Sequence, residues 1–193
     1  MTIEARSLVR SDGRMPDALR PVTLTLGVQK WAEGSCLIKV GGRTYEIQRL
    51  VGRSLRGVVD MAKLGERTIT IDCDVLNADG GTRTASVTGG WVAMAAAMRT
   101  YGMERCLIGR VAAISVGIVN GVTYLDLDYS EDSKAEVDFN VVSTDAGRYV
   151  ELQGTAEGKP FERADVDRML DLASGGLEKL FAAQAEAIAS VKR

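Results

Sequence analysis

Residues 111–119 form a nearly unbroken apolar run, and no other stretch constrains the fold as strongly. Successive side chains of a strand point to opposite faces, so a run that is apolar at both parities predicts a strand buried on both sides. Asn120-Gly121 follows directly, and this pair favours the type I′ turn of a two-residue hairpin. We therefore expect a central strand and a return strand, on which Asp126 and Asp128 alternate with Leu125, Leu127 and Tyr129.

Other segments follow either the period of a strand or the period of a helix. Strand patterns occupy residues 20–26, 36–40 and 68–75, and a second hairpin is expected from residues 139–142 and 149–153. Helical patterns run from Thr44 to Val59, over 91–98, and from Val166 towards the C-terminus. In the last of these, Gly175-Gly176 predicts a bend or a close packing contact. A chain of 193 residues suits one well-buried domain.

The residue types that are missing or rare exclude several functions. Histidine is absent, which rules out Ser-His-Asp and Cys-His catalysis and histidine-ligated zinc. Cys36, Cys73 and Cys106 are too few and too widely spaced for a disulfide framework, and we interpret them as buried thiols. No apolar run is long enough to span a membrane and no secretory signal is evident, so we expect a cytoplasmic protein.

Residues 78–86, Ala-Asp-Gly-Gly-Thr-Arg-Thr-Ala-Ser, have the character of an anion site. Gly80-Gly81 allows the backbone to approach a ligand closely, and the first N–H groups of the following helix have no partner within it. Thr82 adds a hydroxyl, and the guanidinium of Arg83 can bind a phosphate with two hydrogen bonds. A glycine pair after a strand is often only a tight turn. Here Gly42-Arg43-Thr44 repeats the arrangement at the start of another expected helix.

Residues 131–138 contain a cluster of acidic side chains. If residues 132–140 run extended, one face carries Asp132, Lys134, Glu136, Asp138 and Asn140. Such a run is commonly a solvated edge. Crowded carboxylates are also the ligands that Mg²⁺ or Mn²⁺ prefers, and one of them could act as a general acid toward a leaving alkoxide. With the anion site, they suggest phosphoryl-transfer chemistry.

Three arginines, Arg49, Arg53 and Arg56, lie at helical spacing on the polar side of the helix expected after Thr44. They fit a contact with an RNA backbone, and equally a solvated helix face or a subunit contact. The net charge of the chain is −2, so any contact with nucleic acid must come from a local arginine patch of this kind.

Motifs along nearly the whole chain resemble those of the RNase PH family of phosphate-dependent exoribonucleases. They include Ser11-Asp12-Gly13-Arg14, Leu19-Arg20-Pro21-Val22, Gly42-Arg43-Thr44, residues 78–86, Glu131-Asp132-Ser133 and residues 151–158. The resemblance implies a single α+β domain over residues 1–193, a two-layer sandwich of βαβα units with a left-handed crossover, against the usual right-handed preference. It also implies a hexameric ring, assembled as a trimer of dimers.

The resemblance assigns roles to the residues discussed above. It implies a phosphate pocket made of Arg43, Gly81, Thr82 and Arg83, and a catalytic pair, Asp132 and Asp138, that acts with Mg²⁺. In this family inorganic phosphate is a co-substrate: it attacks the last phosphodiester of an RNA, such as a tRNA 3′ end, and releases a nucleoside 5′-diphosphate. A catalytically inactive ring subunit, or an RNA-binding scaffold of an exosome-like assembly, is the alternative.

The chain departs from the family pattern at Gly41-Gly42. Between the matching positions the family has roughly fifty further residues, which form strands and a basic loop that contributes to RNA binding. A true deletion would remove strands from the sheet and cations from the RNA path. If residues are instead missing from the numbering, Gly41 and Gly42 would lie much farther apart than the roughly 3.8 Å of adjacent Cα atoms.

Overall fold

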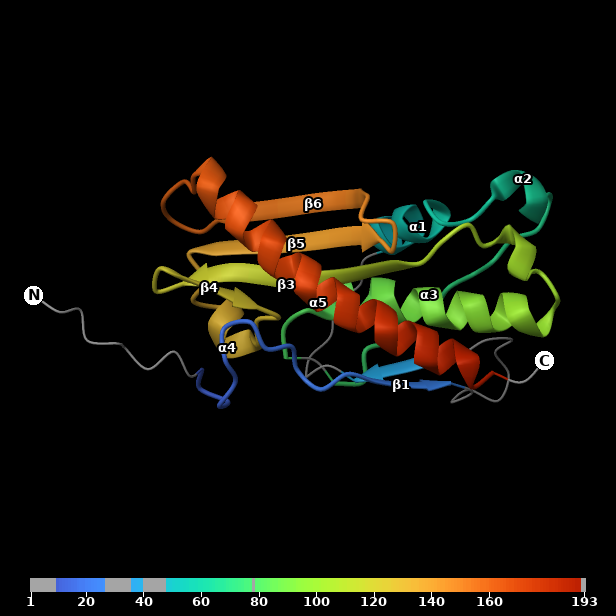
Figure 1. Ribbon diagram of the computed structural model, residues 1–193, viewed down its shortest axis with the longest axis horizontal. Coiled ribbons are helices and arrows are strands. Elements are labelled where there is room, and N and C mark those ends of the chain that lie inside the picture. The colour runs from blue at the N-terminus through green and yellow to red at the C-terminus, as the bar shows by residue number, and fades with distance from the viewer. Residues whose placement is uncertain (1–9, 27–35, 40–47, 78, 192–193) are drawn as a thin grey trace, which may run out of the picture.

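The computed structural model describes residues 10–26, 36–39, 48–77 and 79–191. Its main sheet has four antiparallel strands in the order β4-β3-β5-β6 (Figure 1). These are β3 (Val111–Val119), β4 (Val122–Leu125), β5 (Val137–Thr144) and β6 (Tyr149–Ala156). A separate antiparallel pair consists of β1 (Thr23–Leu26) and β2 (Cys36–Lys39).

The helices are α1 (Gln48–Arg56), α2 (Met61–Leu64), α3 (Thr82–Thr100), α4 (Tyr129–Asp132) and α5 (Arg163–Ala189), with a 3₁₀ turn η1 (Glu104–Cys106). The expected α+β class is confirmed. All strand pairs among these described residues are antiparallel, so the left-handed crossover stays a prediction. None of the described helices is long and apolar enough to cross a membrane.

The apolar run at 111–119 is the central strand that its composition predicts. All nine residues of β3 are buried, and β3 pairs with β4 on one side and with β5 on the other. Asn120 and Gly121 form the connecting turn with positive φ angles of 51° and 74°, as a type I′ hairpin requires. The hairpin of β5 and β6 is also confirmed.

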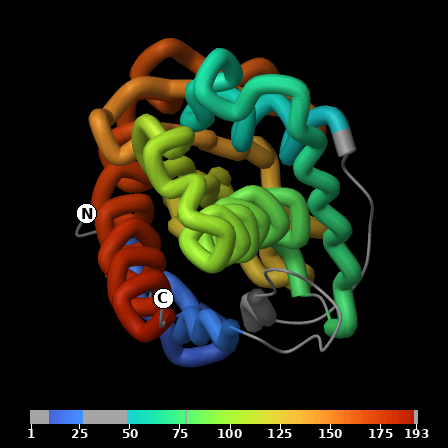
Figure 2. The backbone as a smooth tube through the Cα atoms, turned by 90° about the vertical axis from the view of Figure 1, so that its right-hand side faces the viewer, coloured from blue at the N-terminus to red at the C-terminus, as the bar shows by residue number. Residues whose placement is uncertain are grey.

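Helices cover both faces of the four-stranded sheet, and α3 lies at the centre of the molecule. On one face Ile114 and Val116 of β3 pack against α5 in one apolar cluster. On the other face Val111 and Ala113 pack in a second cluster with α1 and α3. Figure 2 shows α3 surrounded by α5, the β1 segment and the α1–α2 segment. This surrounding explains why α3 is apolar on nearly all sides.

Gly176 lets α5 pack directly on the sheet. A Cβ built on it would lie 2.5 Å from Cδ1 of Ile114 and 2.9 Å from Cδ1 of Leu125, whereas a Cβ on Gly175 would meet nothing within 4 Å. The helix continues through both glycines as one element. The Gly175-Gly176 pair predicted either a bend or a close packing contact, and the structure has the close packing contact.

The strand expected over residues 68–75 is not formed. This segment has no regular secondary structure, although Ile69 and Ile71 pack against the cluster around α3. Alternation gives a segment an apolar face, but a strand also needs a neighbour to satisfy its backbone, and no described strand pairs with this one. Cys73 is exposed, which corrects the expectation of a buried thiol, whereas Cys106 is buried. Gly41, Gly42, Thr44 and the side chain of Cys36 lie outside the described part of the chain.

Candidate active site

The glycine pair forms the N-terminus of α3. Gly81 is the N-cap residue, with φ 67° and ψ 19°, and no side chain caps the helix there. The first N–H groups of α3 are therefore available to an anion. Gly80 has a φ of 81°, and a Cβ on it would lie 2.6 Å from the carbonyl oxygen of Leu127. Both positions favour glycine because their backbone is left-handed, and Gly80 is also pressed against the segment that leads into α4.

That segment ends the return strand earlier than the alternation predicted. β4 stops at Leu125, and Asp126 and Asp128 are buried, with 4% and 6% of their surface exposed. Asp126 accepts hydrogen bonds from Arg20, and Asp128 is the N-cap of α4. The alternation of apolar and acidic residues could not indicate that Asp126 is buried, because its partner Arg20 lies far away in the sequence.

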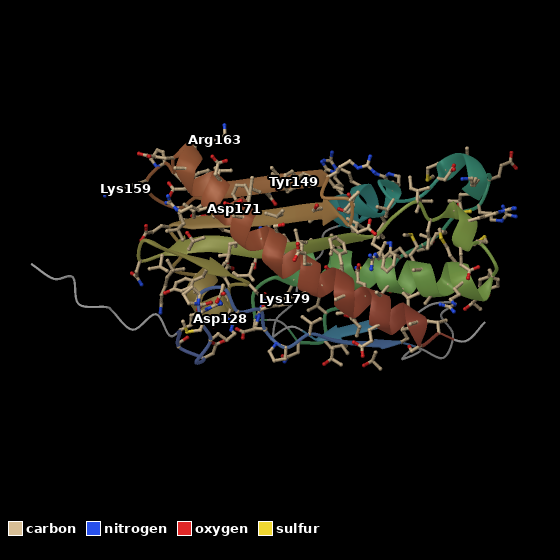
Figure 3. The ribbon with its side chains drawn as sticks, viewed as in Figure 1. Asp128, Tyr149, Lys159, Arg163, Asp171 and Lys179 are labelled. Atoms are coloured by element: carbon tan, nitrogen blue, oxygen red, sulfur yellow. The ribbon has the colours of Figure 1, made fainter. Side chains whose placement is uncertain are left out.

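Asp132 is the last residue of α4, so residues 132–140 do not run extended as expected. The Asp128 side chain accepts from the N–H of Glu131 at 3.0 Å, and the Glu131 side chain accepts from the N–H of Asp128 at 3.0 Å. This capping box favours a helical turn over a strand. Arg10 donates to both carboxylate oxygens of Glu131, at 2.7 and 2.5 Å, and ties α4 to the N-terminal segment. Asp128, at the start of α4, is labelled in Figure 3.

Asp138 projects from β5 on the face that α3 covers. Its neighbour on that face is Asn140, whose Nδ2 lies 3.4 and 3.5 Å from the Asp138 carboxylate oxygens. On β6, Thr155 pairs with Asp138, and Gln153 pairs with Asn140. Arg83 Nη1, at the start of α3, donates to Gln153 Oε1 at 3.4 Å. The sheet register therefore brings the amide partner of Arg83 next to the strand that carries Asp138.

Arg83, Asp132 and Asp138 interact electrostatically. Partial burial raises the pKa of Asp138, the negative charges of Asp132 and Glu157 raise it further, and Arg83 and the Asn140 hydrogen bond oppose the rise. Partial burial and Glu157 likewise raise the pKa of Asp132, against the opposing charge of Arg83. The fold thus brings the arginine and the two aspartates together, although they come from distant parts of the chain.

The donor set suits a hard cation that shares its ligands with a substrate. In the described part of the chain, no cluster of three or more His, Cys, Asp or Glu side chains could hold a metal by itself. Mg²⁺ commonly binds through one or two carboxylates together with phosphate oxygens and water. Asp132 and Asp138, which repel one another, fit that pattern.

The remaining predicted site residues lie as follows. Thr82 is half-buried in the first turn of α3, and Arg43 falls outside the described residues. Arg49, Arg53 and Arg56 are exposed on α1. Arg53 forms an ion pair of 3.2 Å with Glu151 on β6, so at least one arginine of the stripe also holds α1 against the sheet.

Sequence patterns missed the buried ion pairs beneath the site. Arg10 pairs with Glu131, and Arg20 pairs with Asp126, across more than a hundred residues in each case. No local periodicity can indicate such pairs. The available signal was that Arg20 and Glu131 lie in motifs that resemble those of the RNase PH family, Leu19-Arg20-Pro21-Val22 and Glu131-Asp132-Ser133.

Comparisons with known proteins give the family. Residues 41–99 match the model of the 3′ exoribonuclease family, domain 1, and residues 109–176 match domain 2 of the same family. A protein named Ribonuclease PH from Frankia casuarinae is 44% identical, over 94% of this chain and 94% of that protein. The chain belongs to the RNase PH family of 3′ exoribonucleases. A Ribonuclease PH from Synechococcus sp. is 57% identical over 78% of this chain and 63% of that protein.

Solved structures agree on the fold. The crystal structure of rice (Oryza sativa) Rrp46 has a TM-score of 0.71 at 16% identity, and covers 94% of this chain and 100% of that one. The Archaeoglobus fulgidus exosome with RNA bound to the active site has a TM-score of 0.67 at 19% identity, over 90% of this chain and 91% of that one. The expected RNase PH-type fold is confirmed.

The alignment also bears on the missing segment. The match to the Frankia protein extends over 232 positions, more than the 193 residues of this chain. The relative therefore contains residues that have no counterpart here, as the departure at Gly41-Gly42 predicts.

Proposed function

We propose that this chain is a phosphorolytic 3′-to-5′ exoribonuclease, a nucleotidyltransferase that trims RNA 3′ ends, including those of tRNA. The observation that carries the proposal is the electrostatic interaction of Arg83, at an uncapped helix N-terminus, with Asp132 and Asp138. An anion site beside two carboxylates of raised pKa suits phosphoryl transfer without histidine. Membership of the RNase PH family supports the same reaction.

The anion site would hold inorganic phosphate. The N–H groups that follow Gly81, the Thr82 hydroxyl and the Arg83 guanidinium would bind its oxygens, with Arg43 as a further ligand. One phosphate oxygen forms a bond to the phosphorus of the terminal phosphodiester, and the bond from that phosphorus to the 3′-oxygen of the preceding nucleotide breaks. The products are a nucleoside 5′-diphosphate and an RNA that is shorter by one nucleotide.

The departing 3′-oxygen requires a proton. A carboxyl group with a raised pKa holds a proton at higher pH than an ordinary aspartate, and Asp138 or Asp132 is suited to donate it. Alternatively, Mg²⁺ or Mn²⁺ held by the same two side chains in their ionised form would stabilise negative charge on the transferred group and the leaving oxygen. Arg83 would stabilise the charge of the transferred phosphoryl group.

RNA and a second copy of the chain are the proposed partners. Arg49, Arg53 and Arg56 form an exposed cationic stripe on α1 that suits an RNA backbone. A hexameric ring, a trimer of dimers, is the assembly that the resemblance implies. We also propose that residues 1–193 form a single domain and that the protein is cytoplasmic.

One observation favours a second candidate function, a catalytically inactive ring subunit or RNA-binding scaffold. The Frankia relative contains residues that have no counterpart in this chain. A true deletion at Gly41-Gly42 would remove the strands and the basic loop that the resemblance implies there. The retained Arg83, Asp132 and Asp138 favour the enzyme.

The deciding experiment is incubation of a single-stranded RNA with the protein, Mg²⁺ and inorganic phosphate, followed by chromatography of the released nucleotides. We expect nucleoside 5′-diphosphates in amounts that depend on phosphate. Nucleoside monophosphates formed without phosphate would mean hydrolysis and would refute the mechanism. Bound but uncleaved RNA would favour the scaffold.

A further inference from the structure

Arg20 lies buried between two loops that carry opposite halves of the proposed site. Its Nε and Nη2 atoms donate to the two carboxylate oxygens of Asp126, at 3.0 and 2.7 Å, and its backbone N–H donates to the same carboxylate at 2.9 Å. The side chains of Arg20 and Asp126 are 9% and 5% exposed. Asp126 also has a φ of 55°, in the left-handed region that few non-glycine residues adopt.

The other donors of Arg20 reach both loops. Nη1 donates to the carbonyl oxygen of Asp79 at 2.5 Å, directly before the glycine pair, and Nη2 donates to that of Leu127 at 3.3 Å. The Asp79 side chain in turn accepts from the backbone N–H of Tyr129 at 3.2 Å. Arg20 therefore bridges the loop before α3 and the loop before α4.

We propose that Arg20 and Asp126 are a positioning pair that fixes the N-terminus of α3, with Arg83, relative to Asp132 at the end of α4. The planar fork of arginine can satisfy a carboxylate and two carbonyls at once, and lysine cannot. Neither residue touches the reacting atoms. The inference rests on the proposed phosphorolytic function, because only that function needs the two halves of the site in register.

The pair should affect turnover more than phosphate binding. The expected phosphate ligands around Gly81 and Arg83 all lie on the α3 side, whereas Asp132 and Asp138 lie on the other side. Loosening the bridge leaves each half intact and changes the distance between them. A displacement of about 1 Å in a reacting geometry can cost about a hundredfold in rate.

The test compares Arg20→Lys with Arg110→Lys. Arg110 is a matched control because it binds Asp145 through its backbone N–H at 3.0 Å and its Nε at 2.9 Å, and donates to the carbonyl oxygen of Phe181 at 3.0 Å. Arg110→Lys therefore also removes a guanidinium that binds an aspartate and a carbonyl oxygen. Arg110, however, precedes β3 at the end of the strand that does not pair with β4. Asp126→Asn serves as a second variant at the bridge, because it keeps the side-chain shape.

Three readouts are needed. Titration with inorganic phosphate counts the binding sites, and phosphorolysis is then expressed per site, so that a misfolded fraction does not lower the result. We expect Arg20→Lys to lower kcat per site about tenfold to a hundredfold with a phosphate affinity within about twofold of wild type. Amide hydrogen exchange should accelerate in residues 79–84 and 126–132. Arg110→Lys should leave kcat per site, phosphate affinity and the exchange of these residues near the wild-type values.

The outcomes separate this inference from the proposed function. A wild-type protein that releases no nucleoside diphosphates refutes the function, and the exchange data then still report whether Arg20 holds the two loops. Unchanged kcat in Arg20→Lys, unchanged exchange, or equal losses in Arg110→Lys would each overturn the positioning role. If Arg20→Lys does not fold, Asp126→Asn is judged by the same criteria.

Discussion

Arg83 Nη1 lies 3.4 Å from Oε1 of Gln153, an amide on the strand that pairs with the strand of Asp138. The contact joins the start of α3 to β6, the edge strand of the sheet, and restricts the orientation of the guanidinium. It matters because Arg83 is exposed, and an exposed arginine has many other rotamers available.

Gln153→Leu should raise the phosphate KM modestly. The Arg83 guanidinium is charged, but its bond to Gln153 is exposed and 3.4 Å long. We therefore expect a net contribution of about 0.5–1.5 kcal/mol, which corresponds to an increase of about twofold to tenfold, with little change in kcat. Steady-state kinetics at saturating RNA measure it. Leu152→Ala, on the opposite face of β6, is the control and should leave the KM unchanged.

Arg83→Ala and Asp138→Ala should have different kinetic signatures. Loss of the guanidinium removes a phosphate ligand, so the phosphate KM should rise at least tenfold, because a charge-assisted bond contributes about 1.5–3 kcal/mol. Loss of the Asp138 carboxylate should lower kcat at least a hundredfold and spare RNA binding. RNA affinity from a filter-binding assay provides the check. Equal loss of RNA binding in both variants would indicate misfolding or a different site.

Asp138→Asn should stabilise the protein at neutral pH. The fold raises the pKa of Asp138 above the ordinary value of 3.8, so its ionised form is less favourable in the folded state than in the unfolded chain. By linkage, stability from this group is present below pH 3.8 and is lost as pH rises through the raised folded-state pKa. Asparagine removes that loss. The Tm of the variant should exceed that of the wild type at pH 7, and the gap should shrink towards pH 4, as differential scanning fluorimetry would record. A gap that is constant with pH contradicts this account.

Gly80→Ala should cost more stability than Gly147→Ala. Both glycines have positive φ, 81° and 71°, so both variants carry the left-handed penalty of about 1–2 kcal/mol. Only at Gly80 would the new Cβ meet backbone, the carbonyl oxygen of Leu127 at 2.6 Å, whereas Gly147 has nothing within 4 Å. Urea unfolding measures the difference, and only Gly80→Ala should also lower phosphorolysis. Similar losses in the two variants would mean that the loop contact contributes little.

Gly175→Ala and Gly176→Ala should change stability in opposite directions. Alanine at the open position 175 should stabilise α5 by roughly 0.5–1 kcal/mol, because glycine is the poorer helix former. At Gly176 the added methyl group must displace Ile114 and Leu125 in a packed core, at a cost of about 1–3 kcal/mol. The free energy of unfolding in urea gives both values. A stabilised Gly176→Ala would show that the sheet and helix separate easily.

The sequence by itself determined the elements whose signal is local. The central strand β3 and its Asn120-Gly121 hairpin follow from burial on both faces and from turn chemistry, and the all-round apolar pattern of α3 predicts a central helix. The anion loop was recognisable because glycines, a hydroxyl and an arginine are adjacent in the chain. The motifs of the RNase PH family identified the rest of the candidate site.

Only the tertiary structure decided which of these features act together. Asp132 is on a helical turn rather than a strand because Asp128 and Glu131 cap each other, and Asp126 is buried because Arg20 reaches it from the other half of the chain. Residues 68–75 alternate like a strand but remain irregular, since no described strand pairs with them. Periodicity indicates which face of a single helix or strand is apolar, whereas ion pairs and sheet partners depend on residues far apart in the sequence. The register of β5 and β6 places Gln153, the hydrogen-bond partner of Arg83, on the strand beside Asp138.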